Sequence, residues 1–260
     1  MGSAAVQGRL WGAAARDWAR LAEPAATPFY DAVFDAIGVG PGVSLLDAGC
    51  GAGYALTLAA ARGATVTGLD ASAGLLEVAR ERLGDAELHE GDLEALPFGD
   101  ASFDAVTAFN SVQFAADPGA AVRELGRVAR HDAPVAIVPW GAPERCESRV
   151  IIAAIGALLP PPPAGAGGPF ALSEPGLLEK LAESAGLRPE RVAEVPTPFS
   201  YPDLETAIRT QLSAGPARRA IEYAGESPTR GALSAAFAAS RQSDGSYRQD
   251  NIFRFLIARA

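Results

Sequence analysis

Short apolar runs alternate with amphipathic segments through the first half of the chain. The runs that predict strands are residues 43–49, 65–70, 86–92, 103–112 and 133–141, and the segments between them with helical spacing are 54–63, 72–84 and 118–130. Ser72 is expected to cap the helix that follows it. Strands and helices that alternate at this period predict right-handed βαβ units and an open parallel sheet, so the fold class is α/β.

The two ends of the chain depart from this rhythm. Residues 8–37 have helical spacing that is broken at EPAATP, which predicts two short helices. Beyond residue 141 we expect a helix near 148–159, a proline- and glycine-rich excursion, and a helix over 173–186 capped by Ser173 and Gly186. A strand over 191–199 follows, and then helices over 203–240 that are interrupted at Gly215-Pro216 and Ser227-Pro228. The last predicted element is a strand over 251–258, after an Asp244-Gly245 turn.

The pattern therefore predicts four parts. They are an N-terminal helical cap (1–40), a Rossmann-like ligand-binding core (41–141), an insertion (142–170) and a C-terminal completion of the sheet with further helices (171–260). The insertion contains four consecutive prolines beside glycines, a composition that suits an excursion from the sheet. A plain surface loop and a lid over a ligand are equally compatible with it.

Composition narrows the function classes. The 260 residues are 48% hydrophobic, which excludes a wholly disordered chain. A net charge of −9 without a run of Lys or Arg argues against nucleic acid as a partner. The two cysteines, Cys50 and Cys146, are far apart and form no ligand cluster, so no metal is expected. The sequence shows no signal-peptide pattern and no apolar run of membrane-spanning length, which favours a cytoplasmic protein without a membrane partner.

The most informative segment is LLDAGCGAGY (45–54), a glycine-rich turn between a predicted strand and a predicted helix. Such turns let a ligand approach the backbone and the free N–H groups of a helix start. Nucleotide-dependent dehydrogenases have a similar turn, but their fingerprint requires glycine where this chain has the bulky Tyr54. Asp47 would also repel a pyrophosphate, whereas it suits a ligand that carries an ammonium or sulfonium group.

Polar residues also follow the next three strands. Asp70 ends the second strand, where a carboxylate is the usual partner of ribose hydroxyls. Asp92 lies at the end of the third strand and can accept the exocyclic amine of adenine while Leu93 packs on the ring. Asn110 lies at the end of the fourth strand. Because the carboxyl ends of parallel strands lie at one edge of the sheet, these residues are expected to converge on one crevice.

Three segments carry a resemblance to a known family, namely LLDAGCGAGY, VTGLD and EGDLEALPFGDASFDAVTAFNSVQFAADP. Through these segments, residues 40–141 closely resemble the class I S-adenosylmethionine-dependent methyltransferases, in particular the small-molecule branch of the ubiquinone/menaquinone-biosynthesis type. The resemblance implies a seven-stranded sheet of order 3-2-1-4-5-7-6 with strand 7 antiparallel and helices on both faces. It implies S-adenosylmethionine as cofactor and S-adenosylhomocysteine as product. The residues that it assigns to the cofactor are Asp47, Gly49, Gly51, Gly53, Asp70, Ala71, Asp92, Leu93, Asn110 and Ser111.

One departure from this family concerns catalysis. Many members carry histidines shortly after the fourth strand, where this chain has Ser111-Val112-Gln113-Phe114. His89 lies within a predicted strand and His131 at the opposite edge of the sheet, so neither is expected to act as a base. The sequence therefore predicts methyl transfer by proximity and orientation, with no catalytic residue identified.

The position of three residues suggests contacts with the methyl acceptor. Gln113 and Phe114 follow the fourth strand and Trp140 follows the fifth, which places them beside the predicted cofactor crevice. The acceptor expected from them is a small apolar or aromatic molecule. Two alternatives remain: a methyltransferase-like protein that binds the cofactor without transferring methyl, as a regulator or a cyclase, and, with less support, an NAD(P)-dependent oxidoreductase.

Overall fold

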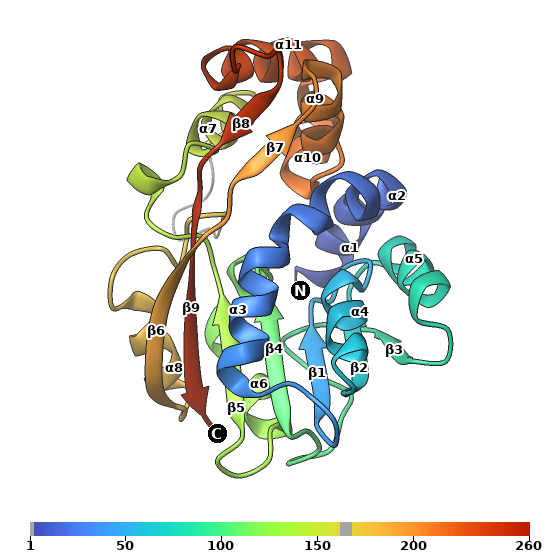
Figure 1. The fold of residues 1–260 in the computed structure, drawn as a ribbon, viewed down its shortest axis with the longest axis vertical. Helices are drawn as coiled ribbons and strands as arrows, with labels where there is room; N and C mark the ends of the chain where they lie inside the picture. Colours follow the sequence, from blue (N-terminus) through green and yellow to red (C-terminus); the bar gives the residue numbers. More distant parts are fainter. Residues whose placement is uncertain (1–2, 162–167) are drawn as a thin grey trace.

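The computed structural model describes residues 3–161 and 168–260 and is built around a seven-stranded sheet (Figure 1). The strand order is β3-β2-β1-β4-β5-β9-β6. Strands β1 to β5 are parallel, and β9 is antiparallel to both β5 and β6. The bounds are β1 (Ser44–Ala48), β2 (Thr65–Asp70), β3 (Glu87–Glu90), β4 (Ala105–Phe109), β5 (Pro134–Val138), β6 (Arg188–Pro196) and β9 (Ile252–Arg259). The predicted order is confirmed, with β9 as the antiparallel strand.

Helices cover both faces of this sheet. On one face α3 (Thr27–Ile37), α4 (Tyr54–Ala61) and α5 (Ala73–Leu83) enclose an apolar cluster, and on the other α6 (Pro118–Val128) and α8 (Leu177–Ser184) enclose a second one. Successive residues of a strand alternate between these clusters: Leu45 belongs to the first and Leu46 to the second. Both faces are therefore apolar, which is why the central strands appear as continuous apolar runs in the sequence.

The N-terminal cap is interrupted at residues 13–14 and not at the predicted position. It consists of α1 (Ala4–Gly12), α2 (Ala15–Asp17), a π-helical turn η1 (Trp18–Ala22), a 3-10 turn η2 (Glu23–Ala26) and then α3. The segment EPAATP does not break the helical path, because Pro24 stands in the first turn of η2, where a missing N–H costs nothing. The first helix also begins at Ala4, before the predicted start at residue 8.

A separate helical region lies beyond the carboxyl edge of the sheet and is drawn above the sheet in Figure 1. It contains α7 (Arg149–Gly156), α9 (Leu204–Leu212), α10 (Gly215–Ala224), α11 (Glu226–Phe237) and a two-stranded sheet of β7 (Phe199–Tyr201) and β8 (Tyr247–Gln249). These helices share one apolar core that includes Ile151, Leu233 and Phe237. The helix of the predicted insertion, α7, is thus packed with the C-terminal helices.

Several local predictions are wrong for identifiable reasons. The predicted strand 191–199 is two strands, since β6 ends at Pro196 and β7 joins the small sheet; β8 was not predicted. The second break among the C-terminal helices falls at Gly225, and Pro228 is tolerated in the first turn of α11. The hydroxyl of Ser173 donates to the carbonyl of Phe170, so Gly176 stands at the N-cap of α8 instead.

The Ser72 cap is confirmed, because its side chain accepts from the N–H of Leu75. Short 3-10 turns complete the described chain at η3 (Val112–Phe114), η4 (Pro143–Arg145) and η5 (Ala238–Ser240). The central part of the predicted proline- and glycine-rich excursion, residues 162–167, lies outside the described residues. In residues 3–161 and 168–260, none of the helices has the length and apolar character needed to cross a bilayer.

Candidate functional site

A cavity of about 360 Å³ lies at the carboxyl edge of the sheet, between the N-terminal cap and the helical region. Its volume is within the usual range for small-molecule sites. The predicted site residues that line it are Asp47, Gly49, Gly51, Asp70, Ala71, Asp92, Leu93, Asn110, Ser111, Phe114 and Trp140. Gly53 and Gln113 do not line it. The structure thus brings together residues from the ends of five strands, as expected from the parallel topology.

The glycine loop between β1 and α4 is folded in a way that side chains would prevent. Gly49, Gly51 and Gly53 all have positive φ, at +82°, +57° and +77°. A Cβ on Gly49 would lie 2.4 Å from the Cβ of Ser111, and one on Gly53 would meet Leu83 at 2.9 Å. Gly49 therefore allows the loop to pass beside the end of β4, whereas Gly53 allows α4 to start against α5. This packing role explains why Gly53 is absent from the cavity wall.

Asp70 fixes the glycine loop from the end of β2. Its carboxylate accepts from the N–H of Gly51 at 2.9 Å and from the N–H of Ser72 at 2.8 Å. Burial raises the pKa of Asp70, and these backbone donors oppose the rise. Each carboxylate oxygen keeps a further lone pair, so Asp70 can still accept from hydroxyl groups of a ligand in the cavity.

Asp47 lies at the base of the cavity with 2% of its surface exposed. The Thr107 hydroxyl donates to its carboxylate at 2.8 Å. Burial raises the pKa of Asp47 to about 7, opposed by the Thr107 hydrogen bond and reinforced by the carboxylates of Asp70 and Glu23. A cationic group of a ligand would relieve this repulsion.

Glu23 is a site residue that sequence reasoning missed. It comes from η2 of the cap, is 4% exposed, and accepts from the N–H of Ala52 in the glycine loop at 2.8 Å. Arg82 of α5 forms an ion pair with it and also donates to the carbonyls of Ala52 at 2.8 Å and Ala19 at 2.6 Å. This Glu23–Arg82 pair ties the cap, the glycine loop and α5 together. Burial raises the pKa of Glu23 to about 7, against the effect of Arg82.

The ends of β3 and β4 complete the polar part of the cavity wall. Asp92 accepts from the N–H of Glu94 at 3.0 Å, in a turn that follows β3. Asn110 has a positive φ of +52°, and its side-chain oxygen accepts from the amide of Gln113. Gln113 is itself 1% exposed, so it holds Asn110 from behind and does not face the cavity. Its contact with an acceptor stays a prediction.

The rest of the cavity wall is mainly aromatic and aliphatic, with a few neutral polar side chains. Trp140 packs on Phe253 with ring centroids 4.4 Å apart, and Phe29 packs on Phe253 at 4.5 Å. The other aromatic residues of the wall are Trp11, Trp18, Tyr30, Phe109, Phe114, Phe199 and Tyr201. Among the described residues, no histidine lines the cavity: His89 pairs with Glu87, and His131 is exposed in the turn before β5.

Comparison with known proteins identifies the core of this fold. The family described as "Methyltransferase domain" matches residues 46–137, which run from β1 to β5 and include the glycine loop, Asp70 and Asp92. Over residues 46–137 the chain is similar to methyltransferase domains, and its sheet has the strand order that the sequence resemblance to the class I S-adenosylmethionine-dependent methyltransferases implied. A demethylmenaquinone methyltransferase of Renibacterium salmoninarum is 36% identical over 111 residues, which cover 43% of this chain and 47% of that protein.

Other similar proteins extend the comparison. An uncharacterized protein of Mycobacterium tuberculosis is 36% identical to this chain over 141 residues, which cover 53% of this chain and 51% of that protein. A geranyl diphosphate C-methyltransferase of Streptomyces coelicolor, solved with Mg²⁺, geranyl diphosphate and S-adenosylhomocysteine, has a TM-score of 0.54 at 16% identity, over 90% of this chain and 78% of that one. At 16% identity, this comparison shows a similar fold and nothing more specific.

The chain spans about half the length, or less, of the curated relatives that it matches. The matched part contains the glycine loop and the strand ends that line the cavity, whereas the cap and the helical region lie outside the family match. Within the described ranges, no group of three or more His, Cys, Asp or Glu side chains is arranged to hold a metal ion.

Proposed function

We propose that this protein transfers a methyl group from S-adenosylmethionine to a small apolar or aromatic molecule. The observation that supports this most strongly is the division of one cavity into two chemically different ends. The carboxylates of Glu23, Asp47, Asp70 and Asp92 lie beside the glycine loop and the strand ends, and the remaining wall is mainly aromatic and aliphatic, with a few neutral polar side chains. An acidic end suits a cationic cofactor, and an apolar end suits an apolar acceptor.

The residues present fit S-adenosylmethionine. Asp70 and Asp92 would hold the ribose and adenine, and the glycine loop would lie against the methionine part, with Asp47 near its ammonium group. Ala71 and Leu93 would contact the nucleoside, and Asn110 and Ser111 the far end of the methionine part. When bound, the cofactor supplies a methyl group on a positively charged sulfur, which is already activated towards displacement.

The protein's own contribution would then be alignment and exclusion of water. The aromatic wall and the cap enclose the acceptor beside the cofactor, and orientation of this kind lowers a barrier by about 7–11 kcal/mol in favourable systems. A general base adds typically about 10²–10⁴-fold, and no described residue at the apolar end is placed as one. We therefore assign the reaction to proximity and orientation.

The test is formation of S-adenosylhomocysteine in the presence of an acceptor. We expect purified protein with S-adenosylmethionine and a panel of neutral phenols, quinols and aryl ketones to give S-adenosylhomocysteine and a product heavier by one methylene, both detected by mass spectrometry. Asp70→Asn keeps the shape of the side chain but lowers its acceptor capacity, and we expect it to reduce the rate by roughly 100-fold.

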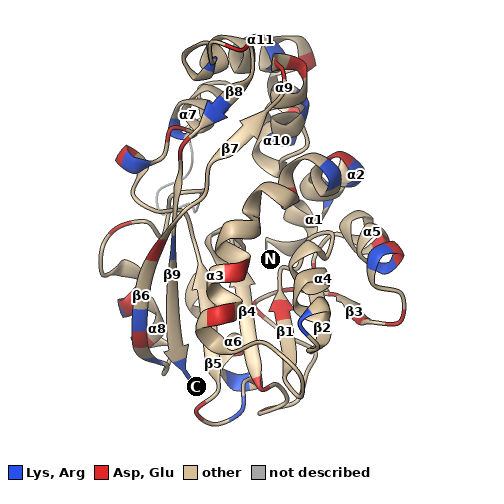
Figure 2. Cartoon of the chain, viewed as in Figure 1, with Lys and Arg blue, Asp and Glu red and all other residues tan. Residues whose placement is uncertain are grey.

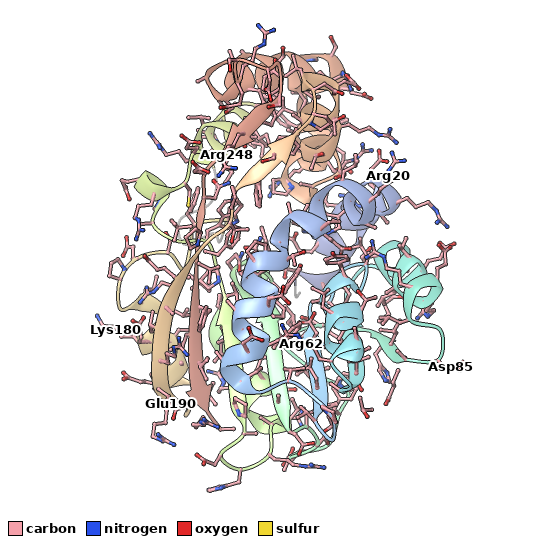
Figure 3. All side chains as sticks on the ribbon, viewed as in Figure 1. Arg20, Arg62, Asp85, Lys180, Glu190 and Arg248 are labelled. Atoms are coloured by element: carbon pink, nitrogen blue, oxygen red, sulfur yellow. The ribbon has the colours of Figure 1, made fainter. Side chains whose placement is uncertain are left out.

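Asp85→Asn is the matched control. Asp85 is exposed in the turn between α5 and β3, remote from the cavity (Figure 3), and its variant should retain the full rate. If the protein binds the cofactor and no member of the panel is methylated, a binding role without transfer replaces the proposal. Equal rates for the Asp70 and Asp85 variants would show that the observed transfer does not depend on this cavity.

A further inference from the structure

The apolar end of the cavity contains a hydrogen-bonded pair, Tyr201 of β7 and Gln211 of α9. The Gln211 amide donates to the Tyr201 hydroxyl oxygen at 3.3 Å, and both residues line the cavity. The Tyr201 ring is held edge-on against Phe237, with centroids 5.6 Å apart, in the core of the helical region. The pair is therefore anchored by β7, α9 and α11, outside the part of the chain that the family match covers.

This pair retains hydrogen-bonding capacity that the described residues do not use. The Tyr201 hydroxyl proton has no acceptor among them, and the Gln211 side-chain oxygen has no donor. Two neighbouring hydroxyls in the wall are already engaged: Ser148 donates to Gln249 at 3.1 Å and Thr210 donates to the carbonyl of Thr206 at 2.7 Å. Because Tyr201 is only 5% exposed, a donor without a partner is costly there unless a ligand supplies one.

The charge of the wall restricts what that ligand can be. Four carboxylates line the cavity, and no Lys, Arg or His side chain does so among the described residues. Figure 2 shows that the charged residues lie mostly on the outer helices and turns. An anionic group would lose its hydration without gaining a counter-ion, whereas a neutral carbonyl or hydroxyl would keep its hydrogen bonds. Burial also raises the pKa of Tyr201 well above its ordinary value, so the phenol remains a donor.

We infer that Tyr201 and Gln211 anchor an uncharged methyl acceptor through a carbonyl or hydroxyl group on an otherwise apolar, aromatic body. This inference rests on the proposed function and deepens it, because it names the part of the site that selects the acceptor. A carbonyl oxygen would accept from the Tyr201 hydroxyl, and a hydroxyl group could in addition donate to the Gln211 oxygen. Anionic acceptors are excluded by the same wall.

The test uses two nearly isosteric probes, 2-acetylnaphthalene and 2-naphthoate, which differ mainly in charge. Each is titrated calorimetrically into protein saturated with S-adenosylhomocysteine. We expect the neutral ketone to bind roughly tenfold or more tightly than the carboxylate. Tyr201→Phe keeps the ring that packs on Phe237 and should weaken ketone binding roughly fivefold, without changing S-adenosylhomocysteine affinity.

Two further variants complete the design. Tyr223→Phe removes a hydroxyl from a tyrosine that is 67% exposed on α10, and it should leave both probes unaffected. Gln211→Arg supplies the cation that the wall lacks and should reverse the preference in favour of 2-naphthoate.

Equal or tighter binding of the carboxylate to the unmodified protein, or no ketone binding up to its solubility limit, would overturn the inference. The same conclusion follows if Tyr201→Phe and Tyr223→Phe bind the ketone equally. The affinity for S-adenosylhomocysteine is measured first on the same samples. Its absence would overturn the proposed function, whereas its presence without discrimination between the probes would overturn only the Tyr201–Gln211 anchor.

Discussion

Gly49→Ala is expected to weaken S-adenosylhomocysteine binding by roughly 100-fold, because the methyl group cannot be accommodated without moving the glycine loop. The added Cβ would lie 2.4 Å from the Cβ of Ser111, a distance that real side chains do not reach. The backbone at Gly49 also has φ +82°, where alanine is disfavoured by about 1–2 kcal/mol. The loop would have to shift, and the N–H groups and Asp70 contacts that shape the cofactor side would shift with it. Calorimetric titration measures the loss.

Two variants separate this clash from a general loss of stability. Gly245→Ala has the same kind of backbone strain, at φ +88°, but its Cβ would meet nothing within 4 Å and it lies far from the cavity. It should lower stability without changing the affinity. Gly49→Ala combined with Ser111→Gly removes the atom that the new methyl group meets, and should restore part of the binding. Wild-type affinity in Gly49→Ala alone would show that the loop is not part of the ligand site.

The affinity for S-adenosylmethionine is expected to rise as the pH increases from 6 to 8. The pKa values of Asp47 and Glu23 are both raised to about 7, chiefly by burial, so each is partly protonated near neutrality. A cationic ligand favours the ionised carboxylates, and binding must therefore release protons. The release of one proton makes the affinity rise by up to about tenfold per pH unit. Titrations at three pH values, in buffers of different ionisation enthalpy, measure both effects.

The carboxyl groups of Asp47 and Glu23 also affect the stability of the ligand-free protein, in the opposite direction with pH. Their folded pKa values lie above the unfolded ones, so between about pH 4.5 and pH 7 the folded state retains protons that the unfolded state has released. The free energy of unfolding should therefore fall, through these groups, as the pH rises over that range. Asp47→Asn should flatten both trends, while Asp85→Asn should change neither. A constant affinity between pH 6 and 8, with no proton release, would contradict this description of the acidic end.

The sheet and the cofactor side could be predicted because their determinants are local in sequence. Each buried parallel strand is a short apolar run, and each strand-to-helix turn carries its own polar residue, such as Asp70 directly after 65–69. Parallel topology then brings these turns to one edge without further information. The Ser72 cap could be predicted for the same reason, because its hydroxyl oxygen accepts from an N–H only three residues further along the chain.

The remaining features depend on contacts between distant parts of the chain. Glu23 lies in a proline-containing segment that indicates a break, and only the folded structure brings it to Ala52 and Arg82, 29 and 59 residues further on. Strand β8 is three residues long and gains its pairing from β7, nearly fifty residues earlier. Tyr201 and Gln211 belong to different elements of the helical region, so no spacing in the sequence marks them as a pair.

The two ends of the cavity therefore differ in how far local sequence signals could predict them. The acidic end, where we propose that the cofactor binds, is formed mainly by β1 to β5 and the turns after them, which the family match covers, together with Glu23 of the cap. The apolar end, where we propose that the acceptor binds, includes the rest of the cap, α7, β7 and α9, which carry no motif of their own. Similarity therefore supports the choice of cofactor, whereas the choice of acceptor depends on this chain's own side chains.

The central claim is that this cavity binds S-adenosylmethionine and its product, and the most direct test is calorimetric titration with S-adenosylhomocysteine. NADH serves as the control ligand, and an Asp70→Ala variant is titrated alongside. The account predicts micromolar binding of S-adenosylhomocysteine to the unmodified protein, a loss of that binding in the variant, and no binding of NADH. Binding of NADH alone, or S-adenosylhomocysteine binding that survives the loss of the Asp70 carboxylate, would contradict it.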